Sequence, residues 1–339
     1  MGFKEKATKL AKDFPSSDEV EFIPSGSVIM DAILGGGVPL GTYIEIASAS
    51  GLGKSTAALH MSKIACSLGR GVIYLDYEQG VNKSQIDGIG LSDYRDELFF
   101  LYHPVTYKDG EKIINKLADE EELAYIIIDS VTSMLPESMR DKSVEDIQPA
   151  LQARLATKFL LKYKYLARRN NVSFIFINQM RTKLNFRGTS STKAAGGNAQ
   201  KFFSDIRLRM GEKKKLEKTE NTLEGEKKIP YGAHVGLWAI KNRYERPYIE
   251  ATMTVIYGKG ISNVSAYYRW LIKSGLIKKK GAGWYEIYMG KEDGEDPEKV
   301  RGEESLKKWV KENMDNVKEY IKEEGGFLLI ADEKDIGGE

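Results

Sequence analysis

The chain has 339 residues, which is enough for two domains or for one large domain with a smaller appendage. With 41% hydrophobic and 29% charged residues, 33 Gly and 9 Pro, its composition is that of an ordinary globular protein and excludes collagen-like, coiled-coil and low-complexity chains. A single cysteine, Cys66, excludes an internal disulfide, and the three histidines have no metal-ligand spacing, which argues against a zinc scaffold. The 51 basic and 49 acidic side chains leave a net charge of +2, so the positions of the charges matter more than their sum.

Membrane and export signals are missing from the sequence pattern. No apolar run approaches the roughly 20 residues that cross a bilayer, and the first residues, MGFKEKATKLAKDF, lack the apolar core of a signal peptide. We therefore expect a cytoplasmic protein without a membrane partner.

Between residues 42 and 177, short apolar runs alternate with helical patterns. This alternation predicts an α/β fold in which crossover helices join the strands of a mostly parallel sheet. Residues 149–170 combine a helical spacing of apolar side chains with no internal proline, which predicts a long helix before the last of these strands. The expected strands are residues 43–47, 72–76, 99–102, 124–129 and 172–177.

After residue 197 the pattern changes to successive strands, FSDIRLRM, HVGLWAIK and YIEATMTVIY, which predict an antiparallel extension of the same sheet. Residues 212–228 are charged and almost without apolar side chains, so we expect a solvated hairpin tip or a mobile loop. Lys and Glu alternate there, which argues against a basic DNA-binding arm.

The chain accordingly divides into four parts. A short N-terminal helix and linker, residues 1–21, precedes the main core at residues 22–261. Helical patterns around an aromatic hairpin, GAGWYEIYMG, predict a small α+β module at residues 262–325, and the acidic, Gly-rich residues 326–339 predict a loosely ordered tail.

A phosphate-binding loop is predicted directly after the first strand of the parallel sheet. Such a loop needs backbone N–H groups that point into a cradle, a Lys that reaches the β- and γ-phosphates, a hydroxyl for Mg²⁺ and a helix N-terminus behind them. Glycines, a lysine and a serine supply these groups here, and one position departs from the usual pattern because its leading Gly is replaced by Ser48. The expected nucleotide contacts are Ser48, Ala49, Ser50, Gly51, Leu52, Gly53, Lys54, Ser55 and Thr56.

Two further strands end in carboxylates. AYIIIDSVTSM ends its apolar run in Asp129, a position from which P-loop ATPases hold the Mg²⁺ shell, so Ser55 and Asp129 are the candidate metal ligands. VIYLDYEQG ends in Asp76 and Glu78, and a carboxylate at the carboxyl end of a parallel strand can deprotonate the water that attacks the γ-phosphate. Glu78 is the candidate base. Without the phosphate loop, an ordinary buried strand and a turn would explain both patterns.

Taken in order, several motifs resemble the RecA recombinase family. They are IPSGSVIMDAILGGGVPLG before the phosphate loop, LDYE, IIIDS, FINQMR, GGNAQKFF, IKNRYERPY and IYGKGIS, and the resemblance covers roughly residues 22–290. LIKKKGAGWY and LKKWVKEN are similar, more weakly, to the family's C-terminal domain. The resemblance implies a RecA-like P-loop ATPase core that forms a head-to-tail filament on single-stranded DNA, pairs it with a homologous duplex and exchanges strands in DNA recombination and repair.

The resemblance also implies roles for single residues. Gln179 would sense the γ-phosphate and pass its state to the loop that follows, while Lys241 and Arg243 would reach the ATP of a neighbouring subunit. Gln85 stands where many relatives carry a tyrosine that stacks on adenine. ATP binding, Mg²⁺ binding and water activation would fall to Lys54, Ser55, Asp129 and Glu78.

A DNA site is predicted independently at residues 180–198, which carry basic but no acidic side chains and are rich in Gly, Ser and Thr. Cations neutralise phosphates, and an aromatic ring such as that of Phe186 lodges between bases. The expected DNA contacts are Arg181, Lys183, Phe186, Arg187, Lys193, Gly196, Gly197 and Asn198, together with Met139 and Arg140 from the mixed-charge stretch 136–148.

Two other functions remain open at this point. A hexameric motor, either a ring helicase or a RadA-like branch-migration ATPase, would use a similar core, although the RadA-like group has an N-terminal zinc finger that a chain with one cysteine does not match. A regulatory ATPase that binds no DNA is the third possibility, and the basic stretch 180–198 argues against it.

Overall fold

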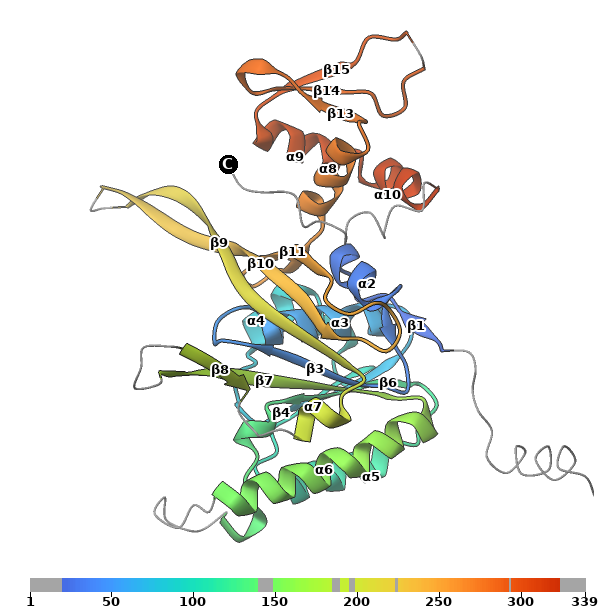
Figure 1. Cartoon of the computed structure of the whole chain (residues 1–339), viewed down its shortest axis with the longest axis vertical. Helices are drawn as coiled ribbons and strands as arrows, with labels where there is room; N and C mark the ends of the chain where they lie inside the picture. The colour runs from blue at the N-terminus through green and yellow to red at the C-terminus, as the bar shows by residue number, and fades with distance from the viewer. Residues whose placement is uncertain are drawn as a thin grey trace, which may run out of the picture.

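The computed structural model describes residues 20–139, 149–184, 190–194, 199–222, 225–292 and 294–323. Within these residues, a ten-stranded sheet has the order β12-β11-β10-β9-β3-β7-β6-β4-β5, with β8 paired to β7 (Figure 1). The α/β class with a parallel sheet and an antiparallel extension is therefore confirmed.

The parallel half of the sheet is buried because helices cover both of its faces. In β6, Tyr125 and Ile127 pack into the apolar cluster on one side, and Ile126 and Ile128 pack into the cluster on the other. This alternation follows from the two-residue period of a strand. The parallel strands are β3 (Tyr43–Ser48), β4 (Gly71–Asp76), β5 (Phe99–Tyr102), β6 (Leu123–Asp129) and β7 (Ser173–Leu184).

Helices cover both faces of the sheet, and all but the first of them lie within residues 42–177, where crossover helices were predicted. One face carries α2 (Val28–Leu34), α3 (Lys54–Ser67) and α4 (Lys83–Ile89), and the other carries α5 (Tyr107–Leu117) and α6 (Pro149–Asn170) (Figure 1). The expected long helix is α6. None of the helices in the described part of the chain is long and apolar enough to span a membrane.

The antiparallel extension is longer than its sequence suggested. β9 (Ile206–Thr222) runs parallel to β3 and then pairs with β10 (Gly225–Lys241), which is followed by β11 (Glu250–Ile256) and β12 (Gly260–Ser262). The stretch 212–228, expected as a hairpin tip or a loop, belongs largely to these two strands and forms a ribbon that projects from the body (Figure 1). The alternation of Lys and Glu sets opposite charges across the ribbon, as in the pair Lys227 and Glu220, and such pairs stabilise antiparallel strands.

The C-terminal part folds as a small α+β unit on one end of the core. Tyr267 and Trp270 on its first helix join the buried cluster that includes Val255 on β11, so the unit packs on the sheet. Its elements are α8 (Val264–Lys273), β13 (Ile277–Lys279), β14 (Trp284–Ile287), β15 (Glu298–Arg301), α9 (Glu303–Glu312) and α10 (Met314–Glu323). The remaining short elements are β1 (Phe22–Ile23), β2 (Val38–Pro39), β8 (Ser190–Ala194) and α7 (Ala199–Phe203).

Candidate functional site

The phosphate loop connects the end of β3 to the start of α3. Gly51 and Gly53 have positive φ angles of 77° and 83°, so a residue with a side chain would be strained at either position. A Cβ on Gly53 would also lie 3.1 Å from a methyl group of Val255. The backbone therefore requires both glycines to turn tightly in front of the helix N-terminus, which is the geometry that presents N–H groups to phosphate.

Lys54 is held inside this loop. Its Nζ donates to Ser48 Oγ at 3.2 Å and to Ala49 O at 2.9 Å, and the residue is 7% exposed. Burial lowers the pKa of Lys54, because the charged ammonium loses solvation. Ser48, which stands in place of the usual glycine, thus supplies a hydroxyl that contacts the lysine directly.

A hydroxyl and a carboxylate meet beside the loop. Ser55 Oγ donates to Asp129 Oδ2 at 2.6 Å, and the Tyr74 hydroxyl donates to the same oxygen at 2.8 Å. Burial raises the pKa of Asp129, whereas the hydrogen bonds from Ser55 and Tyr74 lower it. Oxygen donors of this kind suit Mg²⁺. No group of three His, Cys, Asp or Glu residues in the described structure could hold a metal, so a Mg²⁺ ion here would take its other ligands from phosphates and water.

Glu78 follows the next strand along this edge of the sheet. Ser130 Oγ donates to Glu78 Oε1 at 2.6 Å, and Gln179 Nε2 lies 3.0 Å from both Oε1 and Oε2. The neighbouring Asp76 has a different role, because its carboxylate accepts hydrogen bonds from the backbone N–H groups of Gly80 and Val81 and so caps the turn.

Strand register explains why these residues meet. Asp76 is aligned with Asp129 across β4 and β6, and Ser48 is aligned with Gln179 across β3 and β7. The carboxyl ends of four parallel strands therefore lie at one edge, where ligands bind in open α/β sheets. The predicted residues that the structure brings together here are Ser48, Lys54, Ser55, Glu78, Asp129 and Gln179.

Two contributors to this edge were not predicted from the sequence. Ser130 directly follows Asp129, so its place after an apolar strand was the available signal. Tyr74 lies in β4 and is fully buried, and a tyrosine two residues before Asp76 on the same side of the strand was the corresponding signal. Both act on a predicted carboxylate through a hydroxyl group.

Lys241 and Arg243 lie near the other end of the parallel strands, where β3 begins. Arg243 Nη1 is 2.9 Å from Asp205 Oδ1, and Asp205 Oδ2 accepts a hydrogen bond from Tyr43 N at 3.1 Å. Tyr43 begins β3 and Ser48 ends it, and these ends are about 16 Å apart at roughly 3.3 Å per residue. The two cations therefore do not join the site formed by Lys54 of the same subunit.

The predicted DNA-binding segment begins directly after Gln179, where β7 continues beyond the carboxyl end of β3. β7 continues past Gln179 to Leu184 and pairs with β8, so Arg181, Lys183 and Lys193 lie on a hairpin rather than in an irregular loop. Met139 is only 9% exposed, which leaves little of its side chain for DNA in this arrangement. Arg140, Phe186, Arg187, Gly196, Gly197 and Asn198 lie outside the described residues.

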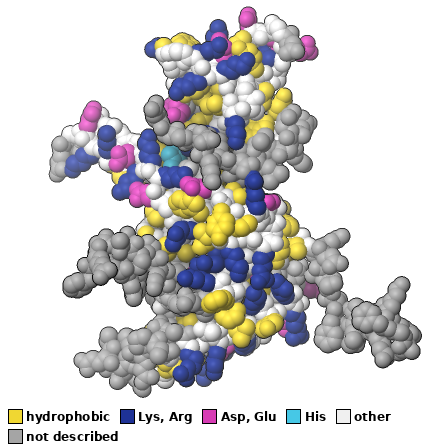
Figure 2. Space-filling view, in the orientation of Figure 1, with side chains coloured by type: hydrophobic (Ala, Val, Ile, Leu, Met, Phe, Trp, Pro, Cys, Tyr) yellow, Lys and Arg dark blue, Asp and Glu magenta, His cyan; other side chains and the backbone are white. Residues whose placement is uncertain are grey.

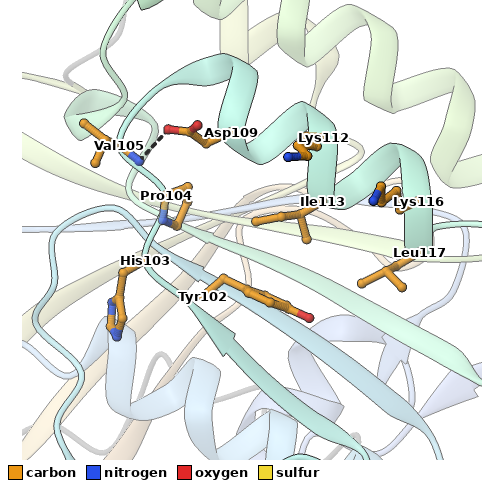
Figure 3. Close-up of a pocket in the computed structure, with 9 residues that line it drawn as sticks. All are labelled: Tyr102, His103, Pro104, Val105, Asp109, Lys112, Ile113, Lys116 and Leu117. Atoms are coloured by element: carbon orange, nitrogen blue, oxygen red, sulfur yellow. Dashed lines mark hydrogen bonds between the residues drawn. The ribbon is translucent and has the colours of Figure 1, made fainter. Parts of the chain in front are cut away.

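A separate hollow of about 580 Å³ lies between the end of β5 and α5 (Figure 3). Lys112, Ile113 and Lys116 project from the helix on one side, while Tyr102 lies beneath them (Figure 3). None of the predicted site residues lines this hollow, so it is separate from the site that contains Lys54 and Glu78.

Comparison with known proteins places the whole chain in a family. The family described as RecA N-terminal domain matches residues 4–262. The chain belongs to the RecA family. It is 34% identical to Protein RecA of Fusobacterium nucleatum over 289 residues, covering 85% of this chain and 73% of that protein. It is 31% identical to Protein RecA of Aquifex pyrophilus over 326 residues, covering 94% of this chain and 87% of that protein.

A solved structure shares the fold. The crystal structure of the RadB recombinase aligns with a TM-score of 0.50 at 18% identity, covering 70% of this chain and 98% of that one. Membership of the RecA family makes this chain a RecA-type recombination protein and a DNA-dependent ATPase.

Proposed function

We propose that this protein binds ATP and Mg²⁺ at the carboxyl edge of its sheet and assembles head to tail into helical filaments on single-stranded DNA, where it pairs a homologous duplex and exchanges strands. The observation that carries this proposal is that two groups of predicted catalytic residues lie at opposite ends of the same strand, too far apart to form one site within a subunit. Lys54 lies at one end of β3, whereas Lys241 and Arg243 lie near the other end.

In the proposed mechanism, the chain's own residues position the nucleotide and the water. Lys54 contacts the β- and γ-phosphates, while Ser55 and Asp129 hold the Mg²⁺ ion. Mg²⁺, when bound, neutralises charge on the phosphates. Glu78 accepts the proton of the attacking water, and Ser130 keeps one of its carboxylate oxygens in place.

Gln179 provides the proposed link between nucleotide and DNA. Its amide donates to Glu78, and a γ-phosphate oxygen would be a competing acceptor for the same N–H groups. Gln179 and Arg181 are two residues apart on the continuous strand β7, so a change at the amide displaces the start of the DNA hairpin. DNA binding and hydrolysis would thereby depend on each other.

The second cationic group for phosphoryl transfer comes from a neighbouring subunit in this proposal. Charge develops on the γ-phosphate during transfer, and a positive group supplied in cis or in trans commonly stabilises it. Lys241 and Arg243 lie at the far edge of their own sheet, so they can reach a phosphate only across a subunit boundary. A contact of this head-to-tail kind generates a ring if it closes and a helix if it does not.

The surface around the two cations has the character of an interface. Tyr165 on α6, Phe202 on α7 and Tyr248 after β10 are 72%, 73% and 77% exposed. Figure 2 shows Lys and Arg side chains gathered near the middle of this face, with apolar side chains beside them. Aromatic residues and Arg are enriched in protein interfaces, which supports contact with a second copy of the chain here.

Electron microscopy with ATP and single-stranded DNA tests the assembly, and a strand-exchange assay with a homologous duplex tests the activity. Extended helical filaments together with exchanged strands are the expected results. Closed rings that unwind DNA or move DNA junctions would instead support the hexameric motor. Its subunits would share the same composite site, but their head-to-tail contacts would close into a ring instead of continuing as a helix.

A further inference from the structure

A buried carboxylate connects Arg243 to the rest of its own subunit. Asp205 is 1% exposed and lies between α7 and β9. Its Oδ2 is fixed by the N–H of Tyr43, while its Oδ1 lies 2.9 Å from Arg243 Nη1 and 3.6 Å from both Lys164 Nζ and Arg168 Nη2. One carboxylate oxygen is therefore shared by three cations.

The contacts to Oδ1 are ionic rather than well-aligned hydrogen bonds. Among the described groups none donates to Oδ1 with hydrogen-bond geometry, although the oxygen is buried. The Arg243 side chain is 47% exposed, so its guanidinium reaches both Asp205 and the surface. An ion pair of this kind separates more readily than a bidentate one.

Lys241 is tied to the same segment. Its Nζ donates to the backbone carbonyls of Lys201 and Ser204, and Lys164 Nζ donates to the carbonyl of Phe203 at 2.8 Å. Ammonium groups therefore occupy the carbonyls at the C-terminal end of α7. Both proposed trans cations are held by the short segment formed by α7 and residues 204–205.

Positive charge exceeds negative charge in this cluster. Burial lowers the pKa of Lys241, and Arg243 and Lys164 lower it further, whereas Asp205 raises it. Arg207 lies nearby, but its charge is balanced by the buried carboxylate of Glu45, so it does not compete for Asp205. The remaining cations compete for one carboxylate, and a polyphosphate brought by another subunit would relieve that competition.

We propose that Asp205 is a positioning residue that holds Arg243 on its own subunit until assembly on DNA releases it toward the neighbouring nucleotide. The proposal rests on the proposed function, in which Arg243 acts in trans. α7 begins at Ala199, directly after the predicted DNA-binding segment 180–198, so only one short helix separates that segment from residues 204–205 along the chain. Asp205 thereby gives DNA a second route to catalysis, separate from Gln179.

Asp205→Asn is the direct test, because Asn keeps an oxygen for the N–H of Tyr43 but loses the charge that holds Arg243. ATP hydrolysis without DNA, measured at protein concentrations at which subunits associate, should rise about two- to fivefold, the range expected for loss of one partly exposed ion pair. The DNA-saturated rate should stay near that of the unmodified protein, so the ratio of the two rates falls. Unchanged DNA-free hydrolysis in a folded Asp205→Asn variant would overturn the proposal.

Arg168→Gln gives a test of opposite sign that does not disturb a buried group. The Arg168 side chain is 57% exposed and competes for Asp205 Oδ1, so its removal should tighten the hold on Arg243 and lower DNA-free hydrolysis about twofold. The matched control is Arg169→Gln, the same charge change at the next, exposed residue of α6, which should leave the rate unchanged. Equal effects of the two substitutions would contradict the proposal even if Asp205→Asn fails to fold.

Arg243→Gln separates this proposal from the proposed function. If Arg243→Gln hydrolyses ATP normally with DNA, the trans role itself is wrong. If Arg243→Gln is inactive while Asp205→Asn and Arg168→Gln both behave like the unmodified protein, the trans role stands and the holding role of Asp205 is rejected. The double variant Asp205→Asn/Arg243→Gln should show none of the gain of Asp205→Asn, because that gain passes through Arg243.

Discussion

The side-chain amide of Gln179 lies 3.0 Å from both carboxylate oxygens of Glu78. The proposed base is therefore engaged by the proposed sensor, and Ser130 holds one of the same oxygens at 2.6 Å. The amide of Gln179 occupies lone pairs of the carboxylate that would otherwise be available to accept a proton from water. Withdrawal of the amide toward a γ-phosphate would free Glu78 only when ATP is bound.

Gln179→Ala should uncouple hydrolysis from DNA. The variant lacks the amide that engages Glu78 and the group that passes the nucleotide state along β7. We expect the ratio of DNA-stimulated to DNA-free hydrolysis to fall toward one, with nucleotide affinity within about twofold of the unmodified protein, because Gln179 contributes to coupling rather than to the phosphate loop. Steady-state hydrolysis with and without single-stranded DNA measures the ratio, and full stimulation in this variant would exclude the sensor role.

Lys54→Ala and Glu78→Gln should separate nucleotide binding from hydrolysis. Lys54→Ala removes the ammonium held in the loop and should lose nucleotide binding, whereas Glu78→Gln should keep binding and lose about 10² to 10⁴-fold in hydrolysis, as expected for a positioned base. Glu78→Gln should also remain on single-stranded DNA with ATP, because its bound state no longer resets. Fluorescent-nucleotide binding and DNA dissociation kinetics check both, and normal turnover by Glu78→Gln would remove it as the base.

Neutralising Arg181 and Lys183 together should weaken DNA binding for all sequences and flatten its salt dependence. Each phosphate contact on a single strand contributes about 0.7 to the slope of log affinity against log salt, so the slope should fall by roughly 1.4 if both residues contact phosphates. Lys227→Gln/Lys228→Gln on the exposed ribbon is the matched control, with the same charge loss away from the hairpin. An equal change of slope in both double variants would mean that only overall charge matters.

Asp31→Asn should stabilise the protein at neutral pH but not in acid. Burial raises the pKa of Asp31 to about 6 from its usual 3.8, so the folded state favours the protonated carboxyl. The stability that this group contributes is present below its unfolded pKa and is lost as pH rises through the folded pKa of about 6. At pH 8 the loss reaches up to about 3 kcal/mol at about 1.4 kcal/mol for each pKa unit, and Asn avoids it. Urea unfolding at pH 4.5 and pH 8 measures the difference, and an equal effect of the substitution at both values would contradict this assignment.

The sequence predicted what depends on local pattern. Asp129 ends β6, Glu78 follows the end of β4, and Gln179 lies in β7 level with the last residue of β3. The parallel arrangement itself brings the carboxyl ends of neighbouring strands together. Which of these side chains contact one another could not be predicted without knowing the register in which the strands pair. The same apolar strands paired one residue out of step would direct other side chains to the site, and nothing in the local sequence around Asp129 identifies Tyr74 as its partner.

The contacts of Asp205 with Lys164, Arg168 and Arg243 could not be predicted from the sequence for the same reason. Asp205 lies in an ordinary strand-start sequence, and its importance comes from Lys164, Arg168 and Arg243, which are distant along the chain. The strand content of residues 212–228 was underestimated because charge and low apolar content indicate solvent exposure, and a two-stranded ribbon in solvent has the same composition as a loop.

Mixing two inactive variants tests the composite site most directly. Neither Glu78→Gln nor the double variant Lys241→Ala/Arg243→Ala should hydrolyse ATP alone, since each lacks one half of every site. A co-assembled mixture contains some boundaries at which an intact Glu78 faces an intact Lys241 and Arg243 from its neighbour. Recovery of DNA-dependent hydrolysis, with a maximum at an intermediate mixing ratio, is the expected result. No recovery at any ratio, with co-assembly on DNA demonstrated, would show that Lys241 and Arg243 do not act on the neighbouring nucleotide.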